Sequence, residues 1–228
     1  MVNPLLETRG LGRLPALDPR DQGFRAAAAL TVPSTRTSRY WNASGWWGDQ
    51  GATPQCVAYA WTHLMEDGPV THSLTPAPLM VPRDFYNECQ LHDEWEGTDY
   101  AGTSVRAGAK VLHVKRLIKE YRWAMTLDEI VQWLLEKGPV VAGTNWYSSM
   151  FDAPGGVSPL TVAGSVVGGH AHKWDGVNTR TRLIRMKNSW GRDWGNDGFA
   201  YLRFEDAERL LREWGEVCCA VEATDTDV

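Results

Sequence analysis

Residues 49–61 read Asp49-Gln50-Gly51-Ala52-Thr53-Pro54-Gln55-Cys56-Val57-Ala58-Tyr59-Ala60-Trp61, and they place a cysteine where a glycine- and proline-bearing loop turns into a helix. From this point apolar residues recur every three or four positions: Val57, Ala60, Trp61 and Leu64. The spacing predicts an amphipathic helix that starts near Cys56 and ends near Gly68. Because the positive end of a helix lowers the pKa of a thiol, Cys56 is a candidate nucleophile.

Three other polar residues suit acyl-transfer chemistry around such a thiol. His170 follows two glycines, which let the backbone approach closely, and an imidazole can take the thiol proton as a general base. Asn188 can accept a hydrogen bond from the far ring nitrogen and so orient that base. Gln50 and the backbone N–H of Cys56 can donate to a developing oxyanion. Each residue alone also has an ordinary structural explanation, such as a buried inert thiol or a polar loop residue.

His172 competes with His170 for the role of the base, because residues two apart in a strand share a face. The same two histidines could form part of a metal pair, but acidic ligands are not near them in the sequence and no C-x-x-C occurs. We therefore expect no metal site and no cofactor. The four cysteines do not form a disulfide framework, which predicts free thiols in a reducing compartment: Cys56, Cys89, Cys218 and Cys219.

The bulk properties are those of a globular protein of 228 residues with a formal net charge of -5. That charge argues against nucleic-acid binding, which usually needs a basic face. No apolar run approaches 18 residues, and the N-terminus has no secretory signal pattern. We expect no membrane association and a cytoplasmic location, and the oligomeric state stays open.

The chain divides into an arm, a catalytic unit and a tail. Residues 1–38 are rich in Pro, Arg and Ala, and they predict either a partly ordered arm or a strap that packs along the folded unit. Residues 39–222 form the catalytic unit, mainly helical over about 56–138 and mainly β over about 139–222. Residues 223–228 form a tail. Helices followed by strands indicate an α+β fold with two lobes.

The expected elements follow from periodicity, caps and turn residues. Thr126 begins a capping box, and Gly138 ends the helix that follows it. Beyond the helix at Cys56, we expect helices over residues 84–91, 104–121, 126–137 and 205–214. We expect strands over residues 140–144, 170–177, 182–189, 199–204 and 216–222.

Four blocks, in order, resemble the papain-like cysteine peptidases. They are residues 49–51, 56–60, 168–171 and 187–199, and the last reads Lys-Asn-Ser-Trp-Gly-Arg-Asp-Trp-Gly-Asn-Asp-Gly-Phe. The resemblance spans about residues 38–222. It implies an α+β fold in which a helical N-terminal lobe packs against a barrel-like antiparallel β lobe, with the active-site cleft between them.

The resemblance also implies roles for individual residues. Cys56 is similar to the nucleophile, His170 to the general base and acid, and Asn188 to the residue that orients the histidine. Gln50 and Cys56 are similar to the oxyanion-hole donors. Two tryptophans are similar to those lining the cleft: Trp190 shields the histidine–asparagine bond, and Trp194 lies on the leaving-group side. For substrate binding we expect Gly102, Val141 and Gly143.

The residues around the nucleophile depart from the usual family pattern, since Thr53-Pro54-Gln55 precede it and Val57 follows it. The expected function is hydrolysis of peptide bonds in peptide or protein substrates through a thioester acyl-enzyme. The alternatives are another thiol acyl transfer (amidase, exopeptidase or transglutaminase-like) or a catalytically weakened papain-like binding module. Because only 55 residues precede Cys56, we expect constitutive activity or control by means other than a usual propeptide.

Overall fold

The computed structural model describes residues 9–41, 46–70 and 80–224. Its α-helices are α1 (Cys56–Asp67), α2 (Pro82–His92), α3 (Val105–Val114), α4 (Leu127–Glu136) and α5 (Phe204–Arg212). Its strands are β1 (Ser38–Tyr40), β2 (Ile118–Trp123), β3 (Val140–Tyr147), β4 (Val166–Asn178), β5 (Leu183–Lys187), β6 (Phe199–Arg203) and β7 (Glu216–Glu222). Short 3₁₀ helices cover Pro19–Phe24, Ala26–Ala29 and Ser148–Phe151.

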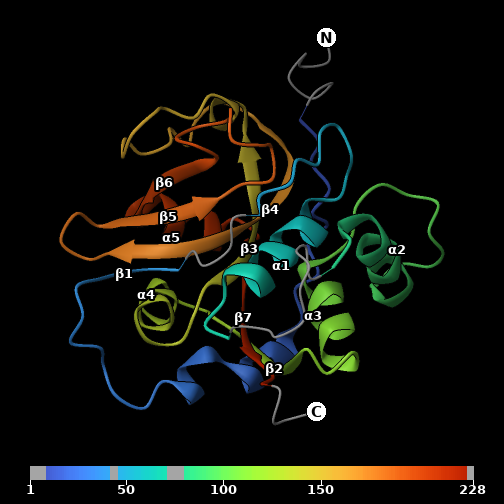
Figure 1. Ribbon diagram of the computed structural model, residues 1–228, viewed down its shortest axis with the longest axis horizontal. Helices are drawn as coiled ribbons and strands as arrows, with labels where there is room; N and C mark the ends of the chain where they lie inside the picture. Colours follow the sequence, from blue (N-terminus) through green and yellow to red (C-terminus); the bar gives the residue numbers. More distant parts are fainter. Residues whose placement is uncertain (1–8, 42–45, 71–79, 225–228) are drawn as a thin grey trace.

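The strands form one antiparallel sheet in the order β2-β7-β3-β4-β5-β6, with β1 paired to β4. Figure 1 shows α1, α2 and α3 grouped on one side of β3 and β4, with β5 and β6 on the other side. The α+β class and the papain-like arrangement are confirmed, although in the described residues the sheet stays open and does not close into a barrel. No described helix has the length and apolar character needed to cross a membrane.

Two hydrophobic clusters lie on opposite faces of the central strands. One gathers residues of α1, α2 and α3, and the other gathers residues of α4 and α5 with much of the sheet. Adjacent strand residues alternate between them, so that Cys218 packs in the first cluster and Cys219 in the second. Both are free thiols, as are Cys56 and Cys89.

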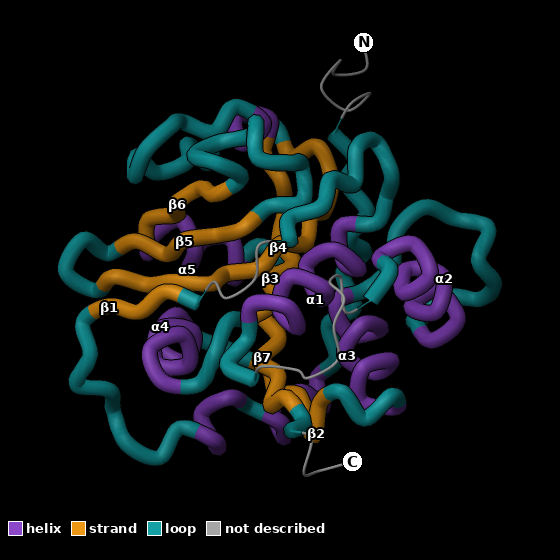
Figure 2. Tube along the Cα trace, in the orientation of Figure 1, coloured by secondary structure: helices purple, strands orange, loops and turns teal. Residues whose placement is uncertain are grey.

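One expected helix is wrong in its second half. The helix predicted over residues 104–121 ends at Val114, and Arg116 takes a left-handed φ of 59°. Ile118–Trp123 then forms β2, which pairs with β7. The β-branched and aromatic residues here favour a sheet position over a fourth helical turn. The capping box at Thr126 is confirmed, because its side chain and that of Glu129 bond reciprocally with the backbone. Figure 2 shows α4, the helix that this box begins, in purple.

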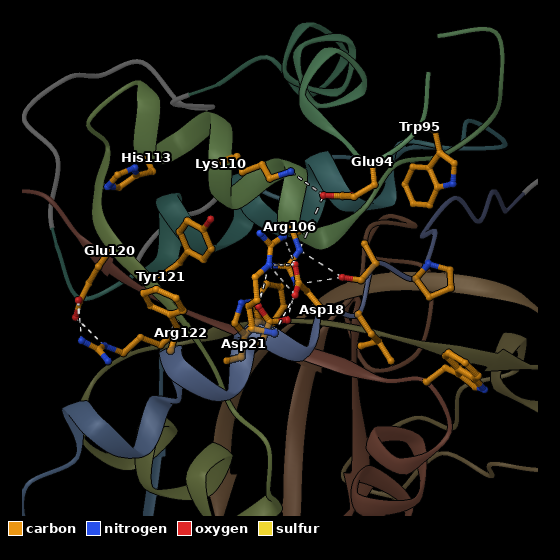
Figure 3. A pocket seen from close by; sticks show the side chains of 17 residues that line it. Asp18, Asp21, Glu94, Trp95, Arg106, Lys110, His113, Glu120, Tyr121 and Arg122 are labelled. Atoms are coloured by element: carbon orange, nitrogen blue, oxygen red, sulfur yellow. Dashed lines mark hydrogen bonds and ion pairs between the residues drawn. The ribbon is translucent and has the colours of Figure 1, made fainter. Parts of the chain in front are cut away.

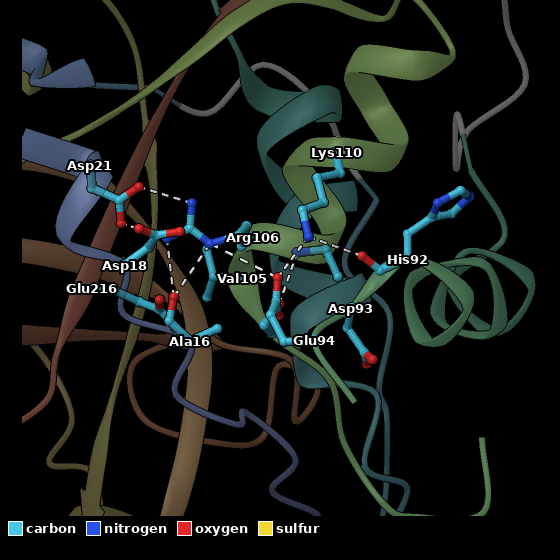
Figure 4. A network of polar contacts seen from close by, with 12 residues as sticks. Ala16, Asp18, Asp21, His92, Asp93, Glu94, Val105, Arg106, Lys110 and Glu216 are labelled. Carbon is cyan, nitrogen blue, oxygen red and sulfur yellow. Dashed lines mark hydrogen bonds and ion pairs between the residues drawn. The ribbon is translucent and has the colours of Figure 1, made fainter. Parts of the chain in front are cut away.

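The N-terminal arm packs along the folded unit, as the strap alternative predicted. Arg106 of α3 holds it, because its guanidinium donates to both carboxylate oxygens of Asp21 and to the carbonyl of Ala16. The guanidinium also lies over the ring of Trp123, 4.6 Å from its centroid. Figure 4 shows this network between the arm and α3. Residues 1–8 of the arm and 225–228 of the tail lie outside the described residues.

A pocket of about 830 Å³ opens between the arm, α3 and β2 (Figure 3). Its walls combine aromatic rings with four cationic side chains. Each of these cations faces a carboxylate: Arg20 with Asp18, Arg106 with Asp21, Lys110 with Glu94, and Arg122 with Glu120. The pairing leaves these walls without a cluster of uncompensated charge.

We expect Arg106→Gln to loosen the arm. The change leaves the buried carboxylate of Asp21 without its cation, which costs about 3 kcal/mol of unfolding free energy. Trypsin should then cut the arm faster at Arg20, measured by mass spectrometry of timed digests. The exposed pair of Lys115 and Glu88 supplies the control, because Lys115→Gln should change neither reading. Equal digestion of the arm in Arg106→Gln and the parent would contradict this role.

Candidate active site

Three elements carry the predicted nucleophile, base and orienting residue. Cys56 is the first residue of α1, His170 lies in β4, and Asn188 directly follows β5. Nε2 of His170 lies 2.7 Å from Oδ1 of Asn188, and both residues are fully buried. The next residue of β4, Ala171, donates its backbone N–H to Sγ of Cys56 at 3.4 Å. The helix and the strand thus bring the thiol beside the segment that carries the imidazole.

Two tryptophans fix the His170 ring. Trp190 stacks on it with centroids 4.7 Å apart and planes 24° apart, and Trp146 meets it edge-on at 4.8 Å. The second ring nitrogen, Nδ1, is buried and makes no hydrogen bond within the described residues. With Nε2 bonded to Asn188, Nδ1 is the nitrogen left to exchange a proton.

Gln50 has a fixed amide orientation. The hydroxyl of Ser189 donates to its Oε1, so its Nε2 faces the other way and donates to the carbonyls of Thr53 and Gly10. Nε1 of Trp190 donates to the same Gly10 carbonyl, at 3.2 Å. Two side-chain donors therefore converge on one carbonyl oxygen, that of Gly10, which is the kind of arrangement an oxyanion hole needs.

Trp194, the second tryptophan expected to line the cleft, packs against Trp190. Its Nε1 donates to the carbonyl of Phe151 at 3.0 Å, and its ring meets Trp190 edge-on at 5.6 Å.

His172, the competing base, is buried with Nε2 3.3 Å from the Thr144 hydroxyl. Burial, with His170 and Arg13 beside it, lowers the pKa of His172 well below its usual value. The structure therefore pairs His170, and not His172, with Asn188.

The chain itself covers this site. Residues 9–16, which we call the strap, run between the two lobes, and Figure 1 shows the dark blue start of the chain descending past α1. Backbone N–H groups of Gly12 and Arg13 donate to the Gly169 carbonyl, both at 3.1 Å. On the opposite side the Thr103 N–H donates to the Gly12 carbonyl, and the Leu14 N–H donates to the Thr103 carbonyl, both at 2.9 Å.

The strap fits so closely that two of its residues must be glycine. A Cβ on Gly12 would lie 2.2 Å from the Pro54 carbonyl oxygen, and a Cβ on Gly10 would lie 2.1 Å from that of Thr53. Cys56 and His170 are both 0% exposed beneath it. Of the two alternatives expected from the sequence, constitutive activity or control by means other than a usual propeptide, the covered thiol favours the second.

Burial also sets the protonation of the covered site. It raises the pKa of Cys56 to about 12, although the backbone N–H groups of Ala171, Val57 and Cys56 itself oppose the rise. Burial lowers the pKa of His170 to about 4, against the hydrogen bond to Asn188. At neutral pH the covered site therefore holds a neutral thiol and a neutral imidazole, not the reactive ion pair.

Of the three residues expected to bind substrate, two lie against the strap and one is buried in the core. Gly102 lies against the strap, because a Cβ there would be 2.4 Å from the Gly12 carbonyl oxygen. Gly143 lies against the strap's Arg13, whose Nε would be 2.9 Å from a Cβ at that position. Val141 is buried in the core cluster with α1 and α3.

Sequence reasoning missed four residues of the site. These are Trp146 beside the base, Thr103 on the strap backbone, Arg13 in the strap and Glu216, which pairs with Arg13. The run Gly10-Leu11-Gly12 carried a signal, since alternate glycines allow close backbone approach. The other residues carried none, because their roles depend on contacts between distant segments.

Comparison with known proteins identifies the family of the chain. A model of the papain family of cysteine proteases matches residues 48–218, a range that includes Cys56, His170 and Asn188. The chain belongs to the papain family. Its fold is similar to xylellain, a cysteine protease from Xylella fastidiosa, with a TM-score of 0.70 at 21% identity over 94% of this chain and 97% of that one.

Other relatives of this papain-family chain are more distant or partial. The solved proCathepsin B S9 from Trypanosoma congolense has a TM-score of 0.63 at 13% identity, over 97% of this chain and 88% of that one. Cathepsin B-like CP3 of Giardia intestinalis is 31% identical over 100 residues, 42% of this chain and 33% of that protein. Mouse cathepsin F is 32% identical over 78 residues, 33% of this chain and 17% of that protein. The matches thus span a third or less of the length of these two curated relatives.

Proposed function

We propose that this papain-family chain hydrolyses peptide bonds, with Cys56 as the nucleophile, His170 as the general base and acid, and Asn188 as the residue that orients the histidine. The observation that carries the proposal is the buried His170–Asn188 hydrogen bond on the strand segment that contacts the Cys56 sulfur. Trp190 supports it, because a stacked indole excludes water from that bond.

The chemistry proceeds in two steps. Nδ1 of His170 takes the thiol proton, and Sγ of Cys56 attacks the scissile carbonyl carbon. The oxyanion accepts hydrogen bonds from Nε2 of Gln50 and the backbone N–H of Cys56. The C–N bond then breaks, His170 returns the proton to the departing amine, and a thioester remains. Water, deprotonated by His170, hydrolyses the thioester and releases the acid and the free thiol.

The strap occupies the place that a substrate needs in this scheme. The Gly10 carbonyl already accepts hydrogen bonds from Gln50 and Trp190, and the Gly12 backbone lies against Pro54. We therefore take the described arrangement as a closed state, and turnover requires the strap to leave.

Cys56→Ala should reduce peptide hydrolysis by at least about a thousandfold, because no other group replaces the nucleophile. The measurement is hydrolysis of a protein substrate, with product ends mapped by mass spectrometry, and labelling by an E-64-type epoxide in parallel. Cys89→Ala, a change at another buried thiol, is the matched control and should keep both activities. An active Cys56→Ala protein would overturn the assignment.

The mapped ends also separate the alternative reactions. Internal cuts along a polypeptide indicate an endopeptidase, and single residues or dipeptides released from one end indicate an exopeptidase. Isopeptide products with a supplied amine would indicate acyl transfer. An accessible, alkylatable Cys56 without any turnover would indicate a binding module.

A further inference from the structure

The pocket between the arm, α3 and β2 is built from two parts of the chain (Figure 3). One wall belongs to the arm and includes Pro15 and Ala16, the last two residues of the strap. The facing wall belongs to the folded unit and includes residues of α3 and β2. Its described lining does not include Cys56, so it is not the candidate active site. We call it the arm pocket.

Aromatic side chains supply much of the surface of the arm pocket. His113, Tyr121 and Trp123 form a row, with successive ring centroids 6.3 and 6.4 Å apart and edge-to-face geometry. Phe24 of the arm is 61% exposed, and Trp214 of the folded unit is 66% exposed. Large apolar side chains that line one cavity and stay this exposed indicate a binding site. Such rings pack by offset stacking or edge-on contact against another planar ring.

Trp214 presents its ring from an unusual backbone conformation. Its φ is 65°, in the left-handed region that favours glycine and is an outlier for a bulky side chain. The carbonyl of Trp214 accepts a hydrogen bond from Nη2 of Arg13, a contact that any residue type at this position could make. Backbone strain under an exposed indole is therefore not explained by contacts within the chain, and it suits a side chain that contacts a ligand.

The charges of the arm pocket balance. Its cations each pair with a carboxylate of the same walls, and they are Arg20, Arg106, Lys110 and Arg122. An anionic or a cationic ligand would have to separate one of these pairs, which leaves a charge without its partner. The walls therefore favour an uncharged ligand. The volume of about 830 Å³ is that of a small-molecule site, since such pockets span about 300–1,000 Å³.

The arm pocket is complete only while the strap is docked, because Pro15 and Ala16 form part of its wall. Arg106 links the two, since its guanidinium lines the pocket and donates to the Ala16 carbonyl. A ligand held there contacts the arm and the folded unit together, so it binds the closed state more tightly than the open state. Such a ligand raises the population of the closed state.

We propose that the arm pocket binds an uncharged, planar aromatic small molecule, and that this ligand keeps the strap over Cys56. The arm pocket is then a regulatory site, separate from the cleft that the strap must leave for turnover. Phe24 on the arm and Trp214 on the folded unit are the ring contacts. Neither binding nor closure requires peptide hydrolysis.

The binding test titrates Prodan, an uncharged naphthalene fluorophore, into the full chain, with the anionic anilinonaphthalene sulfonate in parallel. We expect a saturable rise in Prodan fluorescence and at least about tenfold weaker binding of the sulfonate. Trp214→Gly should weaken Prodan binding at least about tenfold without lowering Tm, because glycine adopts this φ without strain. Phe24→Ala should weaken it from the arm side. Arg116→Gly relieves another exposed left-handed residue, with φ 59°, outside the pocket and should leave binding unchanged.

Two measurements on the strap test closure. Prodan at about ten times its Kd should slow iodoacetamide modification of Cys56 about tenfold, as for a ligand that binds only the closed state. It should also slow trypsin cleavage after Arg9, which lies in the strap outside the arm pocket. The same concentration should protect neither site in Trp214→Gly.

Four results would overturn the inference. They are absence of saturable Prodan binding, tighter binding of the sulfonate, equal Prodan binding by Trp214→Gly and the parent, and binding that leaves Cys56 modification unchanged. Protection of Cys56 with faster cleavage after Arg9 would also overturn it, because that pair of results places the probe in the open cleft with the strap displaced.

Discussion

Gly12→Val should open the site and raise the rate of Cys56 modification by iodoacetamide at pH 7 by about tenfold to a hundredfold. A Cβ on Gly12 would lie 2.2 Å from the carbonyl oxygen and 2.6 Å from the carbonyl carbon of Pro54. Both atoms belong to backbone, so no side chain can rotate away. Overpacking of this kind costs about 1–3 kcal/mol, which corresponds to about five- to 150-fold in the population of the open state.

The same reaction at low pH tests why Cys56 is unreactive in the parent. Cys56 is not exposed in the closed state, so iodoacetamide reaches it only after the strap leaves. While the strap is in place, burial raises the pKa of Cys56 to about 12 and keeps the thiol protonated. In the open state water and a protonated His170 favour the thiolate, so Gly12→Val should react faster than the parent even at pH 6.

Gly23→Val is the matched control, because it lies in the same arm and a Cβ there meets nothing within 4 Å. It should leave both the rate and its pH profile as in the parent. Peptide hydrolysis should follow alkylation, rising in Gly12→Val and not in Gly23→Val. Parent-like alkylation of a folded Gly12→Val protein would show that the strap does not control access to Cys56.

The sequence was most informative about the candidate site where short local patterns mark its residues. Cys56 at a helix start and the Asn188-Ser189-Trp190 block are short patterns with few alternatives, and the helix α1 follows from its apolar period. The sequence misleads where contacts between distant segments decide the local structure. Ile118–Trp123 had a spacing compatible with a helix, yet it forms a strand because β7 offers it a partner.

The strap could be predicted only as one of two alternatives, because its position depends on distant partners. Gly12 bonds to Gly169 and Thr103, and Arg13 pairs with Glu216, 203 residues away. Nothing in the local sequence of Arg13 indicates a buried ion pair, since most arginines are exposed. Closure of the site is therefore a property of the folded chain.

Asp67→Asn should reduce the free energy of unfolding by at least about 3 kcal/mol, because it removes the negative charge that pairs with two buried ammonium groups. Oδ2 of Asp67 lies 2.5 Å from Nζ of Lys173 and 2.6 Å from Nζ of Lys187. All three side chains are 1% exposed or less, so solvent cannot replace the lost charge. Thermal and urea unfolding measure the loss.

The loss should depend on pH in a defined direction. Burial would raise the pKa of Asp67, but the ammonium groups of Lys173 and Lys187 outweigh it and hold that pKa well below the usual value of 3.8. A carboxyl whose folded-state pKa is lowered stabilises the protein above its unfolded-state pKa. The difference between the parent and Asp67→Asn should thus be constant near neutral pH and shrink as the pH falls below about 4. Glu205→Gln, which breaks an exposed pair with Arg182, should cost about 0.5 kcal/mol or less.

The same network also bears on activity, because Asp67, Lys173 and Lys187 belong to the elements that carry the three site residues. Asp67 ends the helix that Cys56 begins, Lys173 lies three residues after His170 in β4, and Lys187 immediately precedes Asn188. Tying these positions together fixes α1 against β4 and β5, and so fixes the thiol relative to the imidazole and the amide. In the Gly12→Val background, Asp67→Asn should therefore lower kcat more than it changes KM at temperatures where the protein remains folded. An unchanged kcat in a destabilised but folded Asp67→Asn variant would show that the network contributes to stability and not to activity.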